Sequence, residues 1–208
     1  MKTIVIVALA ALLAGCGKTQ PAEAPLPENK SPIADMLDNP RFTVPQFILL
    51  ERSGKPFDST SLRGKVFIAD FFFATCLGIC PALTSEMQKV HQATAGMGDV
   101  RLVSISTDEK DTPEVLADYA ARYKADDRWS FLTGKKDEIF KLSTEGFKLV
   151  LADNDAIDAK EKFIHSGMMV LVDREGKIRG YYDAVGPDAE KNRERLLKDL
   201  KRILADKK

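Results

Sequence analysis

The sequence predicts an α/β domain in which helices flank a central mixed β-sheet in three layers, with a β-hairpin added on the N-terminal side. Three observations lead to this fold class. Two apolar runs, Val66–Phe73 and Val100–Ser106, have a helical segment between them, and such a unit crosses right-handed into a parallel sheet. A hairpin with a glycine in its turn follows at Met168–Asp183. An amphipathic segment, Pro187–Ala205, then provides a helix to cover the sheet.

The N-terminal segment predicts an export signal. Residues 1–15 contain a basic Lys2, an apolar run and small residues directly before Cys16. This pattern is similar to the lipobox of bacterial lipoproteins, in which the cysteine is lipidated and becomes the mature N-terminus. A retained N-terminal anchor is the alternative. Either way, we expect the folded part to be membrane-anchored and extracytoplasmic, on the periplasmic side.

A tether and a single domain are predicted to follow the signal. Residues 16–40 are rich in proline and poor in large apolar side chains, which indicates a flexible tether after the lipidated cysteine. Residues 41–208 have the length of one ordinary domain. The chain has 31 basic and 31 acidic residues, so its charge gives no reason to expect nucleic acid as a partner. We expect a monomer.

The elements of the domain can be assigned in chain order from apolar patterns, turn residues and capping signals. We expect a hairpin over Phe42–Leu50 and Ser53–Phe57, strands at Val66–Phe73, Val100–Ser106, Trp129–Leu132, Phe147–Ala152, Met168–Asp173 and Ile178–Asp183, and helices at Pro81–Ala95, Asp111–Tyr123, Lys135–Gly146 and Pro187–Ala205. A polar loop is expected over Asp153–Lys162. This order of elements is that of a thioredoxin-like fold.

Two of the three cysteines lie where this fold places its chemistry. Cys76 and Cys80 follow the first apolar strand and lie at the start of a helix, with Pro81 in a position that suits its first turn. The positive end of the helix dipole should favour the thiolate. The CxxxC spacing puts the sulfurs one turn apart, so the pair can form a disulfide or hold a soft metal ion. A purely structural pair is the alternative, but so short a loop would add little stability.

The two histidines are predicted to differ in role. His91 lies inside the cysteine helix among polar residues, and we expect it to be a solvated surface residue. His165 precedes the strand at Met168, in the loop that lies beside the cysteine corner in a thioredoxin-like sheet. Oxidoreductases of that fold have a cis-proline in this loop, but residues 160–167 contain no proline. We therefore predict that His165 is a metal ligand rather than an ordinary loop residue.

Two thiolates and one imidazole favour copper over zinc. Soft sulfur ligands select Cu(I), and imidazole binds both Cu(I) and Cu(II), whereas a structural zinc site uses four protein ligands. Asp108 and Asp111 follow the second strand, but we expect Asp111 to cap the next helix and Asp108 to be solvated. Three methionines, Met87, Met168 and Met169, are not assigned as ligands, because the last two lie within a strand.

Three segments together resemble the Sco/SenC family of cytochrome oxidase assembly proteins. They are Thr75–Pro81 with its CxxxCP motif, Ser104–Glu114 with Asp-Thr-Pro-Glu, and His165 followed by Met168–Lys177. The resemblance extends over about residues 42–205. It implies a thioredoxin-like fold that binds one copper ion through Cys76, Cys80 and His165.

The resemblance also implies a partner. The family is implicated in metallating the binuclear copper centre of cytochrome c oxidase subunit II, or in keeping the cysteines of that centre reduced. This chain departs from the family pattern at Leu77-Gly78, where Pro-Asp is common, and at Thr107-Asp108, where Asp-Pro is common. Neither change removes a ligand, but both alter the rigidity and charge of their loops.

The thiol pair therefore supports several functions. The first is a copper chaperone that passes its ion by ligand exchange, with a Cys76–Cys80 disulfide blocking loading until it is reduced. The second is a thiol-disulfide reductase, with Cys76 as the catalytic attacking thiolate and Cys80 as the resolving one. A peroxide-consuming enzyme is a third alternative, which the CxxxC pair does not require. A passive lipid-anchored binding module is the fourth, and it differs from the chaperone only in having no downstream acceptor.

Overall fold

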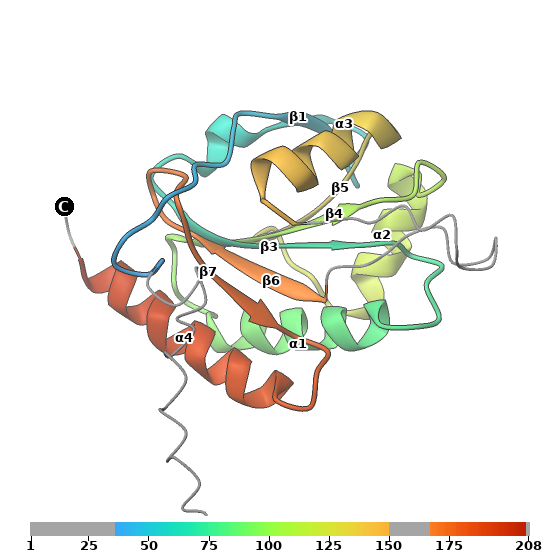
Figure 1. Ribbon diagram of the computed structural model, residues 1–208. Helices are drawn as coiled ribbons and strands as arrows, with labels where there is room; N and C mark the ends of the chain where they lie inside the picture. The colour runs from blue at the N-terminus through green and yellow to red at the C-terminus, as the bar shows by residue number, and fades with distance from the viewer. Residues whose placement is uncertain (1–35, 150–166, 207–208) are drawn as a thin grey trace, which may run out of the picture. The chain divides into compact units, whose positions relative to one another are not determined.

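A computed structural model of the chain describes residues 36–149 and 167–206 (Figure 1). These residues belong to a unit that spans Ser31–Lys208. Its strands are β1 (Ile48–Glu51), β2 (Pro56–Asp58), β3 (Val66–Phe72), β4 (Val100–Ser106), β5 (Trp129–Thr133), β6 (Met168–Val172) and β7 (Ile178–Asp183). Its helices are η1 (Ser59–Leu62), α1 (Cys80–Ala93), α2 (Pro113–Arg122), α3 (Lys136–Lys141), η2 (Leu142–Gly146) and α4 (Ala189–Ala205). No helix within the described ranges is both long and apolar enough to cross a membrane.

The strands form one mixed sheet in the order β2-β1-β5-β4-β3-β6-β7. β3, β4 and β5 are parallel to one another, whereas β1, β6 and β7 pair antiparallel to their neighbours. β3 and β4 are in register from Val66 opposite Val100 to Phe72 opposite Ser106. The carboxyl ends of these strands therefore lie at one edge of the sheet, and antiparallel β6 begins at that same edge.

Helices cover both faces of the sheet, which makes the three layers predicted from the sequence (Figure 1). β3 is buried on both sides, and its successive side chains point to opposite faces. Ile68 and Phe72 belong to a core that includes side chains of α1, α2 and α4. Phe67 and Phe71 belong to a second core on the opposite face, where α3 lies. The predicted fold class is confirmed.

The element boundaries differ from prediction at several points. β1 begins at Ile48 rather than Phe42, and the helix expected over Lys135–Gly146 is divided into α3 and a π-helical turn, η2. The strand predicted over Phe147–Ala152 is not formed over Phe147–Leu149, where Lys148 has a φ of 56°. That left-handed conformation interrupts an extended strand. The rest of that strand, most of the predicted polar loop and His165 lie outside the described residues.

The folded part of the chain begins by residue 36. Met36 is buried in the core on the α3 side of the sheet. The next residue, Leu37, offers its carbonyl oxygen to the Arg179 guanidinium at 2.7 Å from Nε. Asp38 pairs with Arg202 of α4. The segment before β1 is thus held by side chains of β7 and α4.

Candidate metal centre

The connection between β3 and α1 carries the two cysteines. β3 ends at Phe72, and Cys80 is the first residue of α1. Ile79 precedes the helix and provides no side-chain hydrogen bond to it, while Pro81 occupies the first turn. Proline fits there because its missing N–H would have had no partner within the helix. The uncapped first turn therefore directs backbone N–H groups towards the cysteine corner.

Both cysteine side chains are buried, and neither is in a disulfide. Cys76 is 8% exposed and Cys80 is fully enclosed. Burial raises the pKa of the Cys80 thiol, and a hydrogen bond with Cys76 raises it further. The helix start was expected to favour the thiolate. At Cys80 the thiol is favoured instead, because desolvation of the charged sulfur outweighs the helix dipole.

A loop from the next strand fixes the backbone just before Cys76. The Ala74 N–H donates to Asp111 Oδ2 at 2.8 Å, and the Ser106 hydroxyl donates to the same oxygen at 2.6 Å. Asp111 is 1% exposed. Burial raises the pKa of this carboxyl despite those two hydrogen bonds. Asp111 therefore positions the cysteine loop from the carboxyl end of β4.

The predicted helix cap at Asp111 is wrong. Thr112 is the N-cap of α2, and its hydroxyl accepts from the Val115 N–H at 3.4 Å. Asp111 is directed instead towards Ala74, because the parallel pairing of β3 and β4 brings their two following loops together. Asp108 accepts from the Lys110 N–H at 2.9 Å and is partly exposed, so it is only partly solvated.

The position of His165 stays a prediction. Residue 165 lies outside the described residues, but β6 begins at Met168 and pairs with β3 at the edge of the sheet that carries the cysteines. Within residues 36–149 and 167–206, no three His, Cys, Asp or Glu side chains are arranged to hold a metal ion. Two cysteines alone suit a soft ion such as Cu(I). A third ligand of these four residue types would have to come from a part of the chain outside the described ranges.

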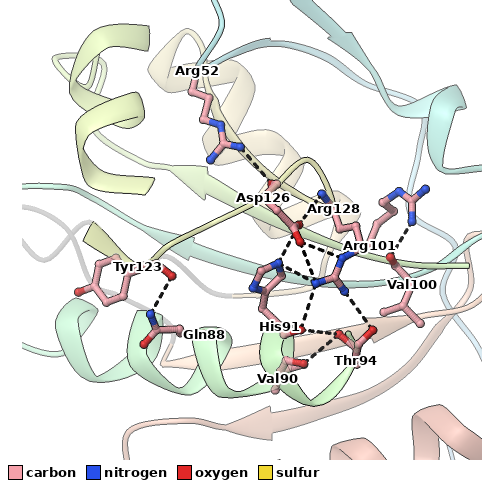
Figure 2. A network of polar contacts seen from close by, with 10 residues as sticks. All are labelled: Arg52, Gln88, Val90, His91, Thr94, Val100, Arg101, Tyr123, Asp126 and Arg128. Carbon is pink, nitrogen blue, oxygen red and sulfur yellow. Dashed lines mark hydrogen bonds and ion pairs between the residues drawn. The ribbon is translucent and has the colours of Figure 1, made fainter. Parts of the chain in front are cut away.

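His91 is buried, and the prediction of a solvated surface residue is wrong. It is 6% exposed, and its ring lies 5.4 Å from that of Trp129. Figure 2 shows its Nε2 facing Asp126 and Arg128, at 2.8 and 3.0 Å respectively. One nitrogen cannot donate to Asp126 and also accept from Arg128. We assign the Nε2 proton to the bond with Asp126, because Arg128 has its own bonds to that carboxylate.

This cluster is structural rather than metal-binding. It joins the C-terminal half of α1 to the loop before β5, more than two turns along the helix from Cys80. Burial alone would raise the pKa of Asp126, but hydrogen bonds from His91 and Arg128 lower it to about 2. The polar neighbours of His91 in sequence suggested solvent, but its partners come from residues 126–128, which periodicity along one helix does not reveal.

The methionines near the site are core or strand residues. Met87 of α1 and Met169 of β6 are fully buried in the core that contains both cysteines. Met168 is half-buried at the start of β6. The expectation that at least one strand methionine faces the core is confirmed by Met169.

Asp70 is a buried carboxyl group that the sequence reasoning did not single out. It is fully enclosed in β3, six residues before Cys76. Its Oδ1 accepts from the Ser104 hydroxyl at 2.5 Å, and Ser104 in turn accepts from the Trp129 indole N–H at 2.9 Å. Oδ2 has no hydrogen-bond partner among the described residues. An acidic residue inside the apolar run Val66–Phe73 was the signal that could have identified it.

Comparison with known proteins gives one consistent family. The family model described as SCO1/SenC matches residues 36–205. A SCO1 protein homolog of Bacillus subtilis is 34% identical over 148 residues, covering 69% of this chain and 75% of the relative. A Stutzerimonas stutzeri protein, whose name proposes copper binding, is 31% identical over 144 residues, covering 68% of this chain and 69% of the relative.

Solved structures agree with the sequence relatives. A SCO1/SenC family lipoprotein from Bacillus anthracis superimposes with a TM-score of 0.70 at 29% identity, covering 78% of this chain and 95% of that one. BsSco, described as a member of the Sco family of cytochrome c oxidase assembly proteins in which a disulfide switch was identified, superimposes with a TM-score of 0.68 at 30% identity. It covers 82% of this chain and 98% of that one.

Proposed function

The chain belongs to the SCO1/SenC family, and from this premise we propose that it is an extracytoplasmic copper-binding protein that delivers copper to subunit II of cytochrome c oxidase. The observation that carries the proposal is the pair of buried cysteines, one in the connection from β3 and one at the first residue of α1, which are not joined in a disulfide. The proposed ligands are the Cys76 and Cys80 thiolates and the His165 imidazole. The copper-binding name of the Stutzerimonas stutzeri relative and the assembly role stated for BsSco support this function.

The proposed mechanism is transfer by ligand exchange. Each copper–sulfur bond formed to an acceptor thiolate would replace one to Cys76 or Cys80, a further acceptor ligand would replace the His165 imidazole, and the oxidation state of the copper would not change. Protons lost by the acceptor thiols are taken up by the two cysteines that are released. A site with three protein ligands has room for the incoming sulfur, whereas a closed four-ligand site would not. A Cys76–Cys80 disulfide would prevent loading, since metals bind thiolates.

We also propose that lipid on Cys16 holds the protein at the membrane. The small residues before Cys16 support this anchor, as does the lipoprotein name of the Bacillus anthracis structure. Labelling of the exported protein with radioactive palmitate tests it. We expect label in the parent and none in Cys16→Ser, and a parent protein without label would contradict the anchor.

Copper titration of the reduced protein tests the metal site. The parent should bind one Cu(I) per chain, and Cys76→Ser, Cys80→Ser and His165→Ala should each weaken binding at least tenfold. His91→Gln is the matched control, because it changes the other histidine and should leave the stoichiometry at one. A parent protein that binds no copper, or a His165→Ala variant that binds as tightly as the parent, would overturn the proposed site.

A thiol-disulfide reductase is the second candidate function. The hydrogen bond between Cys76 and Cys80 favours it, because sulfurs in this proximity can form the disulfide of such a cycle. An assay of the copper-free protein separates the two functions. Rapid reduction of a partner disulfide that does not depend on His165 would support the reductase, whereas copper binding that requires His165 supports the chaperone.

A further inference from the structure

The surface around the thiol pair is uncharged over an unusually long stretch. No Asp, Glu, Lys or Arg occurs in residues 71–85, although such residues make up 30% of the chain. Five of these residues are exposed: Thr75, Leu77, Gly78, Pro81 and Ala82. The exposed residues that flank the two cysteines in the chain are thus uncharged, and four of the five are apolar or glycine.

Leu77 is the most exposed large apolar side chain among the described residues. Its exposure is 99%, compared with 61% for Ile48 and 43% for Phe140. A single exposed leucine is ordinary on a protein surface. The position of Leu77 distinguishes it from the other exposed apolar residues, because it directly follows Cys76 in the chain and projects from the loop that leads into α1. It contributes nothing to the core on either face of the sheet.

Gly78 leaves one side of the Cys76 sulfur open. A Cβ atom built on Gly78 would lie 3.8 Å from Cys76 Sγ. Any side chain at position 78 would therefore contact the sulfur, and glycine has none. Cys76 is 8% exposed, and the residues that follow it, Leu77 and Gly78, are both exposed at the surface.

Charged groups lie at the margin of this surface. Glu109 and Lys110 are exposed on the loop after β4. That loop is tied to the cysteine loop by the bond between Asp111 and the Ala74 N–H. An apolar centre with a charged margin is the usual composition of a protein–protein contact.

From these features we infer that Leu77 is the central contact residue of an acceptor-docking surface, and that the acceptor presents an uncharged, apolar surface around its copper-receiving thiols. This inference rests on the proposed copper delivery. Ligand exchange requires the acceptor sulfur to reach Cys76, so Leu77 must be covered when the two proteins meet. A carboxylate in its place would be desolvated against an apolar surface, which is costly.

The test measures copper loading and copper transfer separately in the full-length chain. Parent, Leu77→Asp and Leu77→Met proteins are loaded with Cu(I) in detergent and mixed with the reduced, copper-free soluble domain of subunit II from the same organism. Transfer to glutathione measures release to a small thiol. Phe140→Asp on α3 is the matched control, because it puts the same charge at an exposed apolar position on the opposite side of the sheet from α1.

We expect Leu77→Asp to load copper and to release it to glutathione as the parent does, but to transfer it to subunit II at least tenfold more slowly. Leu77→Met should stay within twofold of the parent, and so should Phe140→Asp. Equal transfer by the parent and Leu77→Asp would overturn the docking role alone. Slower release of copper to glutathione would place the effect in the metal site and also overturn it. A parent that loads copper but transfers none to subunit II would overturn delivery, and the docking surface with it.

Discussion

Asp70 places an ionisable side chain inside the core between β3 and α1, and its burial couples stability to pH. Burial raises the pKa of Asp70 to about 7, although the Ser104 hydroxyl donates to it. In the unfolded chain an aspartate titrates near 4. Between these values the folded protein keeps a proton that the unfolded chain has lost. The stability due to Asp70 is therefore fully present below about pH 4 and is lost as the pH rises through about 7.

Asp70→Asn should remove this dependence. The asparagine carbonyl can still accept from Ser104, and it carries no charge. We expect the variant to exceed the parent in free energy of unfolding by roughly 2–4 kcal/mol at pH 8, with a smaller difference at pH 5. Urea unfolding at the two pH values measures this. A difference between the two proteins that is the same at both pH values would contradict a titrating Asp70.

Asp111 fixes the cysteine loop, so its removal should lower both the stability of the domain and the affinity of the thiols for Cu(I). Asp111→Ala leaves the Ala74 N–H and the Ser106 hydroxyl without their acceptor in a buried place. Such a loss costs about 1–3 kcal/mol. We expect urea unfolding to show this decrease in the free energy of unfolding. We also expect weaker Cu(I) binding in a competition titration.

Asp108→Ala is the control for this prediction. It removes a carboxylate from the same loop, but Asp108 is partly exposed and its carboxylate accepts from the backbone N–H of Lys110 within that loop. We expect a stability change below about 1 kcal/mol. Copper binding unchanged in Asp111→Ala would mean that the loop holds its shape without this carboxylate.

At the scale of elements, an ion pair with little solvent exposure joins α1 to α4. Glu86 and Arg193 are 2.5 Å apart, with side chains 10% and 14% exposed. Burial alone would raise the pKa of Glu86, but hydrogen bonds from Lys89 and Arg193 lower it. The stability from this carboxylate is therefore present above the ordinary glutamate pKa and is lost as the pH falls below it.

Glu86→Gln should weaken the contact between these helices. We expect a loss of about 1–3 kcal/mol near pH 7, because Arg193 Nη1 stays enclosed without the charge of its carboxylate partner, and Glu190 reaches only the other terminal nitrogen from an exposed position. Glu190→Gln is the matched control, since Glu190 pairs with the same arginine but is 79% exposed. It should cost less than about 1 kcal/mol. Urea unfolding of both variants, and of a double-mutant cycle with Arg193→Met, measures the coupling energy between Glu86 and Arg193. Equal losses of stability in Glu86→Gln and Glu190→Gln would refute a buried pair.

Most of the elements could be predicted from the sequence, because apolar runs and caps are local signals. The buried strand β3, the helix after it and the final hairpin follow from residue patterns within each segment. The predictions that were wrong concerned side chains whose contacts come from distant segments of the chain. Asp111 accepts from the Ala74 N–H instead of capping the helix that follows it. His91 is buried against Asp126 and Arg128, which the residues next to it in the sequence do not indicate. Cys80 begins α1 as predicted, but Cys76 lies in the connection before the helix. The burial that raises the pKa of Cys80 depends on the packing of α1 against the sheet.

At the scale of the whole molecule, the topology collects the candidate site at one edge of the sheet. β3 and β4 end there, and β6 begins there, so segments more than 90 residues apart in sequence meet beside the cysteines. The thiols also belong to the core on the α1 side of the sheet. An ion held by both cysteines would therefore link β3 and α1 within that core, and its binding should stabilise the domain as a whole.

Reduced protein should accordingly unfold at a higher temperature with Cu(I) than without it. A ligand at one hundred times its dissociation constant adds about 2.7 kcal/mol of stability when it binds only the folded state. For a domain of this size, that corresponds to a rise in Tm of roughly 5–10 °C. Calorimetry with Cu(I) buffered by a competing chelator measures the shift. Cys80→Ser and the oxidised protein should show almost none, since neither offers two thiolates, and an equal shift in Cys80→Ser would mean that copper binds elsewhere on the chain.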